Sequence, residues 1–349
     1  MKTEHEPLPA FQRILGRVRE RVLDVVERVS TTRYGVYGLA LLRIGYGLIL
    51  LGLLLLNYGD RRLLWGPESP LSSGPLRESL AKDGTFSLFA LSDSGIQFEI
   101  LYHAFIVLTV LFLVGWRTRW VTPLLAIMVW SWRHRQPWVL DGGDDVMQLA
   151  LIYLSFADLS ARWSLDAKRA ARLSAERGPA FPDPTTGCLR WRVATVLHNT
   201  ALLATLIQVC LLYMNTGLLK VQGGAWQEGS ALYYALRIEE AQPFPGLSRL
   251  IYDNALLVTL GSYAAVFVQL TFPLLMLNSI ARRVGLVAVM GMHVGIGLLM
   301  GLLSFSLIMI STDLLFIRGS SIERAAQLVR TVLAQRVRTV LAPVLRMSR

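Results

Sequence analysis

Long apolar runs are the feature that most limits what this chain can fold into. Several of them are close to the ~20 residues that a helix needs to cross the ~30 Å hydrocarbon layer of a bilayer. The runs cover 37–56, 98–115, 121–132, 146–159, 193–219, 254–277 and 284–317. Because 53% of the 349 residues are hydrophobic, the chain is predicted to be an all-α, polytopic membrane protein.

The placement of arginine and lysine predicts the orientation. Basic residues concentrate in the N-terminal segment, in the turns at 117–119 and 282–283, in the loop 160–192 and in the C-terminal tail. Such segments stay in the cytoplasm, so both termini are predicted on the cytoplasmic side of the plasma (inner) membrane. The run 284–317 must then cross twice, as two short spans turning near Gly301 or Ser304, or as a re-entrant hairpin. About eight transmembrane helices follow from this rule.

Both ends of the chain are predicted to be amphipathic and to lie on the membrane surface. Residues from Pro9 to Val29 alternate apolar and arginine-rich faces at helical spacing, and the basic tail 318–349 does the same. The predicted parts are therefore an N-terminal helix (1–34), a transmembrane domain (35–317) and a C-terminal helix (318–349). The net charge of +11 comes from basic segments that flank the apolar runs, so the predicted partners are membrane lipids and not nucleic acid.

The stretch from Cys210 to Tyr234 holds the main candidate site. It brings Lys220 to the end of a long apolar run, and a Gly-Gly break and a turn follow with Trp226 and Glu228. An ionisable group at such a depth marks a site by default. The alternative is that the lysine only extends its ammonium to the lipid headgroups. The turn predicts an indole and a carboxylate close to the ammonium.

Other polar residues in or near the spans have more than one interpretation. Arg43 either reaches the near interface or pairs with an acidic or carbonyl group inside the bundle. The acidic turn Asp141-Gly-Gly-Asp144-Asp145 either binds a divalent cation, pairs with Lys220 or, as we favour, caps the helix that follows. The two cysteines suggest neither a disulfide framework nor a metal site.

Three histidines lie within the predicted spans. His103 and His198 are predicted to be neutral imidazoles that hydrogen-bond between helices. His293 lies among glycines, where backbones approach closely, and is an equally good candidate for proton transfer or cofactor contact.

These motifs resemble a known family. Gly217-Leu-Leu-Lys220 followed by Ala225-Trp-Gln-Glu-Gly229 resembles the membrane domain of vitamin K-dependent gamma-carboxylases and of their bacterial relatives, the horizontally transferred transmembrane domain family. The resemblance includes Arg43, the turn at Asp144, Ser164-Leu-Asp166, and His293 with Ser304-Phe-Ser306. It covers roughly 32–317.

The resemblance implies a quinol-dependent activity. Lys220 looks like the carboxylase lysine that deprotonates vitamin K hydroquinone, and burial would favour its free amine. His293 is implied as a second catalytic residue. A reduced quinone, menaquinol or vitamin K hydroquinone, is expected to enter from the bilayer with the aromatic residues Trp226, Tyr233 and Tyr234 beside its ring. The further candidate binding residues are Glu228, Asp144 and Arg43.

The chain also departs from the carboxylases. No histidine stands after Trp138, where they carry a functional one, and no large extramembrane region follows the membrane domain. The short form resembles bacterial relatives that serve the maturation of exported antimicrobial peptides, including sporulation-delaying peptides. A small secreted peptide is therefore an expected partner. A non-enzymatic maturation or immunity component and a small-molecule transporter are the alternatives to an enzyme.

Overall fold

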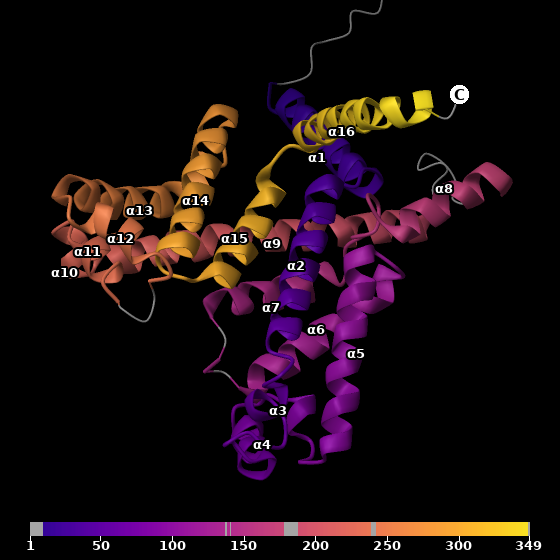
Figure 1. Cartoon of the computed structure of the whole chain (residues 1–349). Helices are drawn as coiled ribbons and strands as arrows, with labels where there is room; N and C mark the ends of the chain where they lie inside the picture. Colours follow the sequence, from indigo (N-terminus) through magenta and orange to yellow (C-terminus); the bar gives the residue numbers. More distant parts are fainter. Residues whose placement is uncertain (1–9, 137, 140, 178–187, 239–241, 348–349) are drawn as a thin grey trace, which may run out of the picture.

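The computed structural model describes residues 10–136, 138–139, 141–177, 188–238 and 242–347. Pro9, the predicted start of the N-terminal helix, and residues 178–187 of the predicted basic loop lie outside this part, as does the end of the tail at 348–349. All regular secondary structure in the described residues is helical, and no strand occurs among them (Figure 1). Its elements are α1 (Ala10–Thr31), α2 (Val36–Leu56), α3 (Arg61–Leu64), α4 (Ser73–Lys82), η1 (Leu88–Ala90), α5 (Gly95–Val114), α6 (Thr118–Arg135), α7 (Gly142–Leu154), α8 (Leu165–Arg177), α9 (Leu189–Val221), α10 (Gly224–Gln227), α11 (Ala231–Ala235), α12 (Pro245–Tyr252), α13 (Ala255–Leu275), α14 (Ser279–Leu299), α15 (Leu303–Asp313), η4 (Leu314–Phe316) and α16 (Gly319–Met347).

Within the described residues, five helices are long and apolar enough to cross a membrane: α2, α5, α9, α13 and α14. The prediction of a helical, multi-pass membrane protein is thereby confirmed. The bent pair Leu303–Phe316 and Gly319–Val332, which turns by 113°, is a sixth candidate if it counts as one span. The helices α6 and α7 do not qualify. α6 ends in Arg133, His134 and Arg135, and the 13 residues of α7 reach only ~20 Å. The full set of eight crossings stays a prediction.

The run 284–317 breaks where the sequence predicted. α14 ends at Leu299 and α15 begins at Leu303, with Gly301 between them at a φ of +69°. A left-handed backbone of this kind favours glycine, because a side chain would clash with the following carbonyl. The two helices pack against each other as a hairpin.

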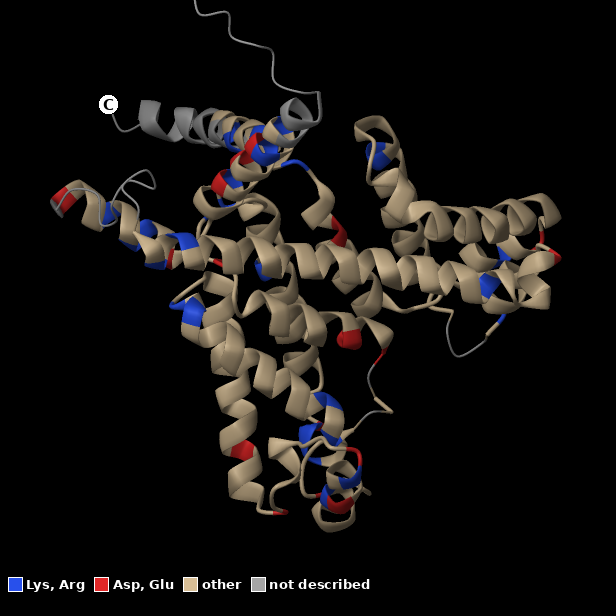
Figure 2. Ribbon diagram, turned by 180° about the vertical axis from the view of Figure 1, so that it is seen from behind, with Lys and Arg blue, Asp and Glu red and all other residues tan. Residues whose placement is uncertain are grey.

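The long helices form two groups that cross. α2, α5, α6 and α7 pack together, and α9 lies against α13 and crosses the direction of α2 and α5 (Figure 1). The basic helices α1, α8 and α16 gather in the upper right of that view, whereas α3–α4 and α10–α12 lie at the two far ends. Charged residues concentrate at these three places and are sparse along the middle of the long helices (Figure 2).

The buried side chains form two clusters. The larger one lies mostly among α2, α5, α6 and α7, around Tyr46, Phe105 and Trp132. The smaller one joins α9, α13, α14 and α15 and contains Tyr213 and Phe272. The second cluster positions the candidate site, because it carries the inner turns of the helices on which Lys220 and His293 stand.

Arg43 is fully buried and ties the first group together through backbone carbonyls. Its guanidinium donates to the carbonyls of Leu159 (3.1 Å), Phe112 (3.0 Å) and Trp163 (2.7 Å), and also to that of Leu113. Two of these acceptors, Phe112 and Leu113, lie in the last turn of α5, where the helix dipole favours a cation. Of the alternatives predicted for Arg43, pairing with carbonyl groups inside the bundle is the one observed.

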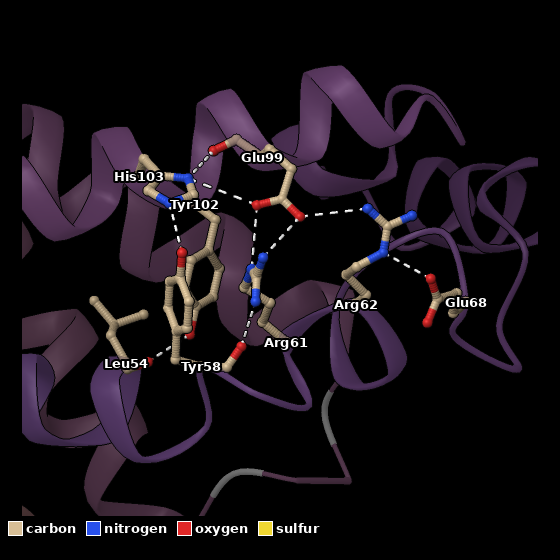
Figure 3. A network of polar contacts seen from close by, with 8 residues as sticks. All are labelled: Leu54, Tyr58, Arg61, Arg62, Glu68, Glu99, Tyr102 and His103. Atoms are coloured by element: carbon tan, nitrogen blue, oxygen red, sulfur yellow. Dashed lines mark hydrogen bonds and ion pairs between the residues drawn. The ribbon is translucent and has the colours of Figure 1, made fainter.

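A polar network anchors the connection between α2 and α5. Glu99 accepts two hydrogen bonds of 3.1 Å from Arg61 and one of 3.4 Å from Arg62, which also bonds Glu68 (Figure 3). His103 contacts the Glu99 carbonyl at 2.7 Å and the Tyr58 hydroxyl at 2.9 Å. The predicted hydrogen bonding of His103 is observed, but within its own helix and to the turn after α2. The bidentate pairing of Arg61 with Glu99 fixes α3 on the start of α5.

Candidate functional site

Lys220 stands in the last turn of α9 and is half-buried. Its Nζ donates a hydrogen bond of 2.7 Å to Oε1 of Gln269 on α13 and lies 5.0 Å from the centre of the Trp226 ring. With Thr216 and Leu219, the lysine and the indole line a pocket of about 270 Å³. The amine is therefore held against apolar surface, in contact with a neutral amide and an aromatic face.

The contact between Lys220 and Gln269 depends on a close approach of two helices. A Cβ added to Gly217 would lie 2.7 Å from the backbone nitrogen of Leu270 and 2.9 Å from its Cα. Gly217 precedes Lys220 by three residues and Leu270 follows Gln269, so the two pairs share one face of the α9–α13 interface. Small residues allow this kind of packing in membrane helices.

We expect Gly217→Ala to separate α9 from α13 and to weaken the Lys220–Gln269 hydrogen bond. Overpacking at such a contact costs about 1–3 kcal/mol. Gly291→Ala on α14 is the matched control, because a Cβ there meets nothing within 4 Å. The measurement is the apparent melting temperature of both variants in detergent. Equal melting temperatures would contradict the role of Gly217.

The turn that carries Trp226 is docked on α13. The Tyr263 hydroxyl donates to the carbonyl of Gln227 at 2.8 Å, and the amide of Leu232 donates to Oγ of Ser262 at 3.0 Å. Gly229 has a φ of +72° and packs against Thr259 and Tyr263. These contacts place the indole over the lysine, as the sequence predicted for Trp226.

The remaining residues predicted around Lys220 lie elsewhere. Glu228 is exposed and, within the described residues, no carboxylate lies within salt-bridge distance of Lys220, which corrects the predicted lysine–carboxylate contact. Tyr233 packs instead on Tyr252 and Arg237, and Tyr234 is 63% exposed. The pocket lining contains neither tyrosine.

The acidic turn caps α7. Asp141 is the N-cap residue and accepts from the amide of Gly143 at 2.7 Å, while Asp144 accepts from the amide of Asp141 at 2.9 Å. The favoured interpretation, a helix cap, is therefore confirmed: Asp141 is the N-cap residue and Asp144 completes a capping box. Asp145 pairs with Arg133 at 2.5 Å, so these carboxylates do not pair with Lys220. Among the described residues, no group of three or more histidine, cysteine or acidic side chains is placed to hold a metal ion.

His293 belongs to a buried polar cluster that sequence reasoning did not find. The Tyr213 hydroxyl lies 2.9 Å from Nε2 of His293 and donates to the Asp313 carboxylate at 2.9 and 3.1 Å. Each of the three side chains is at most 1% exposed. Asp313, an acidic residue within an apolar run, was the available signal, because charged groups there face the bundle interior and have a function by default.

His198 and His293 differ in how their ring nitrogens are used. In His198, Nδ1 accepts from the amide of Asp158 at 2.9 Å and Nε2 contacts the Tyr34 carbonyl at 2.8 Å, so one nitrogen accepts and the other donates. This is the neutral, structural imidazole predicted for His198. In His293, Nδ1 is buried and has no hydrogen-bond partner among the described residues.

The cluster and the lysine pocket lie on one face of α9. Tyr213 precedes Lys220 by seven residues, which is two helical turns or ~10 Å along the axis. Thr216, which lines the pocket, lies between them. His293 bonds Tyr213, which stands on the same helix as Lys220. The structure thus brings Lys220, Trp226 and His293 into one region, whereas Arg43 and Asp144 make their contacts on other elements.

Comparison with known proteins identifies one relative over most of the chain. The chain is 26% identical over 312 residues to a Bacillus subtilis (strain 168) protein with the name "Uncharacterized protein YitO". The matched region is 87% of this chain and 91% of that protein. No family model matches the chain, and no solved structure matches it. The relative's name states no activity, so the chemistry of the site has to indicate the function.

Proposed function

We propose that this protein is a membrane enzyme in which Lys220 acts as a base toward a reduced quinone. The observation that carries the proposal is the half-buried amine, hydrogen-bonded to the neutral Gln269 and facing an apolar pocket with Trp226. A lysine paired with a carboxylate would stay an ammonium, whereas one held against apolar surface can give up its proton. General bases need this property.

The residues of the pocket suit a flat, apolar ligand with an acidic hydroxyl. The indole of Trp226 offers an aromatic face, Leu219 offers aliphatic surface, and the volume of about 270 Å³ is of the size of a small ring system. Gln269 holds the amine at 2.7 Å and so fixes its direction. When bound, a quinol would supply a hydroxyl proton and reducing electrons. Lys220 would take up that proton.

The orientation and the peptide partner are part of the same proposal. With both termini cytoplasmic, the end of α9 that carries Lys220 faces the outer side of the plasma membrane, where an exported peptide would be modified. The separation of the basic helices α1, α8 and α16 from α10–α12 supports this orientation (Figure 2). If no quinone binds, the alternative function is that of a maturation or immunity component without catalytic activity.

Binding of a short-chain naphthoquinone to the protein in lipid nanodiscs tests the proposal. Trp226→Leu is expected to weaken binding about fivefold, because aromatic stacking is worth about 1 kcal/mol. Trp138→Leu is the control, since Trp138 is 88% exposed and lies outside the pocket lining. Quenching of tryptophan fluorescence reports the binding. Equal affinity of the Trp226 variant and the wild type would contradict a quinone site here.

A further inference from the structure

A second buried arginine, Arg135, lies where α6 ends, and most of its guanidinium has no acceptor. The side chain is 1% exposed. Its Nη2 donates to the carbonyl of Gly66 at 3.0 Å, whereas Nε and Nη1 are buried and have no hydrogen-bond partner among the described residues. Arg43, by contrast, uses all three of its nitrogens on backbone carbonyls. A buried charge without a partner is costly, so this guanidinium calls for an acceptor that carries negative charge.

Two buried indoles beside Arg135 are also donors without acceptors. Trp132 precedes Arg135 by about one turn of α6, on the same side of the helix. Trp65 is next to Gly66, the residue whose carbonyl Arg135 binds. The two indole rings are 5.0 Å apart, and each side chain is 1% exposed. In both, Nε1 is buried and has no hydrogen-bond partner among the residues that the structure describes. Arginine and tryptophan side chains only donate, so these three residues cannot satisfy one another.

The carboxylates of this region are engaged elsewhere. Glu68 and Glu99 pair with the two arginines of α3 (Figure 3). Asp93 is exposed and accepts from the amide of Ser73 at 3.1 Å. Within the described part of the chain, no carboxylate forms an ion pair with Arg135. The guanidinium and the two indoles thus form a group of donors to which these residues bring no acceptor.

We propose that Arg135, Trp132 and Trp65 bind a small monovalent anion of about the size of chloride. The ion accepts from Nε and Nη1 of the guanidinium and from the two indole Nε1 groups. It supplies the negative charge that a buried guanidinium requires and, unlike a water molecule, brings no protons that need acceptors. Because each of the three side chains is only 1% exposed, the site takes a small ion and excludes an organic carboxylate or a lipid phosphate.

The ion joins two elements that meet at one end of the first helix group. Trp65 belongs to the chain just after α3, whereas Trp132 and Arg135 belong to α6. The hydroxyl of Ser87 donates to the carbonyl of Ser131 at 2.5 Å and fixes the start of η1 on the same part of α6. The bound anion therefore stabilises the contact of the α3–α4 segment with α6, independently of the quinol chemistry proposed for the lysine pocket.

Chloride binding to the protein in nanodiscs tests the site directly. Equilibrium dialysis with radiolabelled chloride, at constant ionic strength set by sodium gluconate, is expected to show one saturable ion per chain. Arg135→Gln is expected to abolish this binding, whereas Arg172→Gln on the exposed face of α8 should keep it. Absence of saturable chloride in the wild type would overturn the proposal, and so would unchanged binding in Arg135→Gln.

Single indole N–H groups give a test that keeps the guanidinium. Trp132→Phe is expected to weaken chloride binding at least about tenfold, the effect of one lost hydrogen bond to a charged group. Trp130→Phe is the matched control. Its Nε1 is also buried and unpartnered among the described residues, but its ring stacks on His134 at 4.5 Å, on another face of α6. Equal affinities in the two variants would overturn the site.

The melting temperature provides a second readout. A ligand that binds only the folded protein raises it with increasing concentration. Replacing gluconate by chloride or bromide should therefore raise the melting temperature of the wild type and of Trp130→Phe, and should leave that of Arg135→Gln unchanged. An equal rise in Arg135→Gln would show a general effect of the salt and would overturn the proposal.

Discussion

Lys220→Ala and Lys220→Arg are both expected to lower the turnover of a reduced quinone by about 10²–10⁴-fold, the usual contribution of a general base. Alanine removes the amine. Arginine keeps a positive charge but does not lose its proton in proteins, so it cannot act as a base. The measurement is the initial rate of naphthoquinol oxidation by the purified protein in nanodiscs, with dissolved dioxygen as the electron acceptor and the melting temperature recorded for each variant.

Lys82→Ala and Lys168→Ala serve as controls for the Lys220 variants. Both lysines are exposed, on α4 and α8, away from the pocket. They should retain the rate of the wild type. Substantial turnover in Lys220→Arg would show that a charge and not a titrating amine is needed there. That result would remove the base from the proposed function and favour a binding or scaffold role.

Arg43→Met is expected to lower the free energy of unfolding by about 3–5 kcal/mol. The change leaves the carbonyl oxygens of Leu113, Leu159 and Trp163 without their side-chain donor, whereas that of Phe112 keeps the amide of Gly115. Each buried acceptor left unsatisfied costs about 1–3 kcal/mol. The apparent melting temperature in detergent should fall by several degrees, because a change of 1 kcal/mol shifts it by about 2 °C or more in domains of moderate size.

Arg43→Lys should recover only part of this loss. A lysine ammonium has three donors on one nitrogen, whereas the guanidinium reaches its acceptors from three separate nitrogens. Arg172→Met on the exposed face of α8 is the control and should change the melting temperature little. If Arg43→Met melted like the Arg172 variant, the carbonyl contacts would not stabilise the bundle.

Residues that act within a few positions of one another were predictable. Lys220 and Trp226 are six residues apart on one helix end and its turn, so their proximity follows from local geometry. The break at Gly301 and the cap at 141–144 are equally local, because glycine in a left-handed conformation and aspartate before a helix are recognised from neighbours alone. The predicted contact between Glu228 and Lys220 was wrong, because the packing of the turn on α13 decides which of its side chains reach the lysine.

Partners distant in the sequence were not predictable. Gln269 lies 49 positions from Lys220, and Asp313 lies 100 positions from Tyr213. A single sequence does not show which turn of α13 meets α9. In a membrane the hydrophobic effect does not distinguish lipid from another apolar helix face as a neighbour. The register is set by steric fit, here by the contact of Gly217 with the backbone of Leu270.

The amino-acid sequence by itself therefore determined that this is a helical membrane protein and that a lysine and an indole share one helix end. It did so because hydrophobicity and charge act on each segment alone. Only the tertiary structure decided that the lysine bonds Gln269, that Arg43 holds backbone carbonyls, and that His293 joins Tyr213 and Asp313. These outcomes depend on how closely specific helices can approach, and that is a property of packed surfaces.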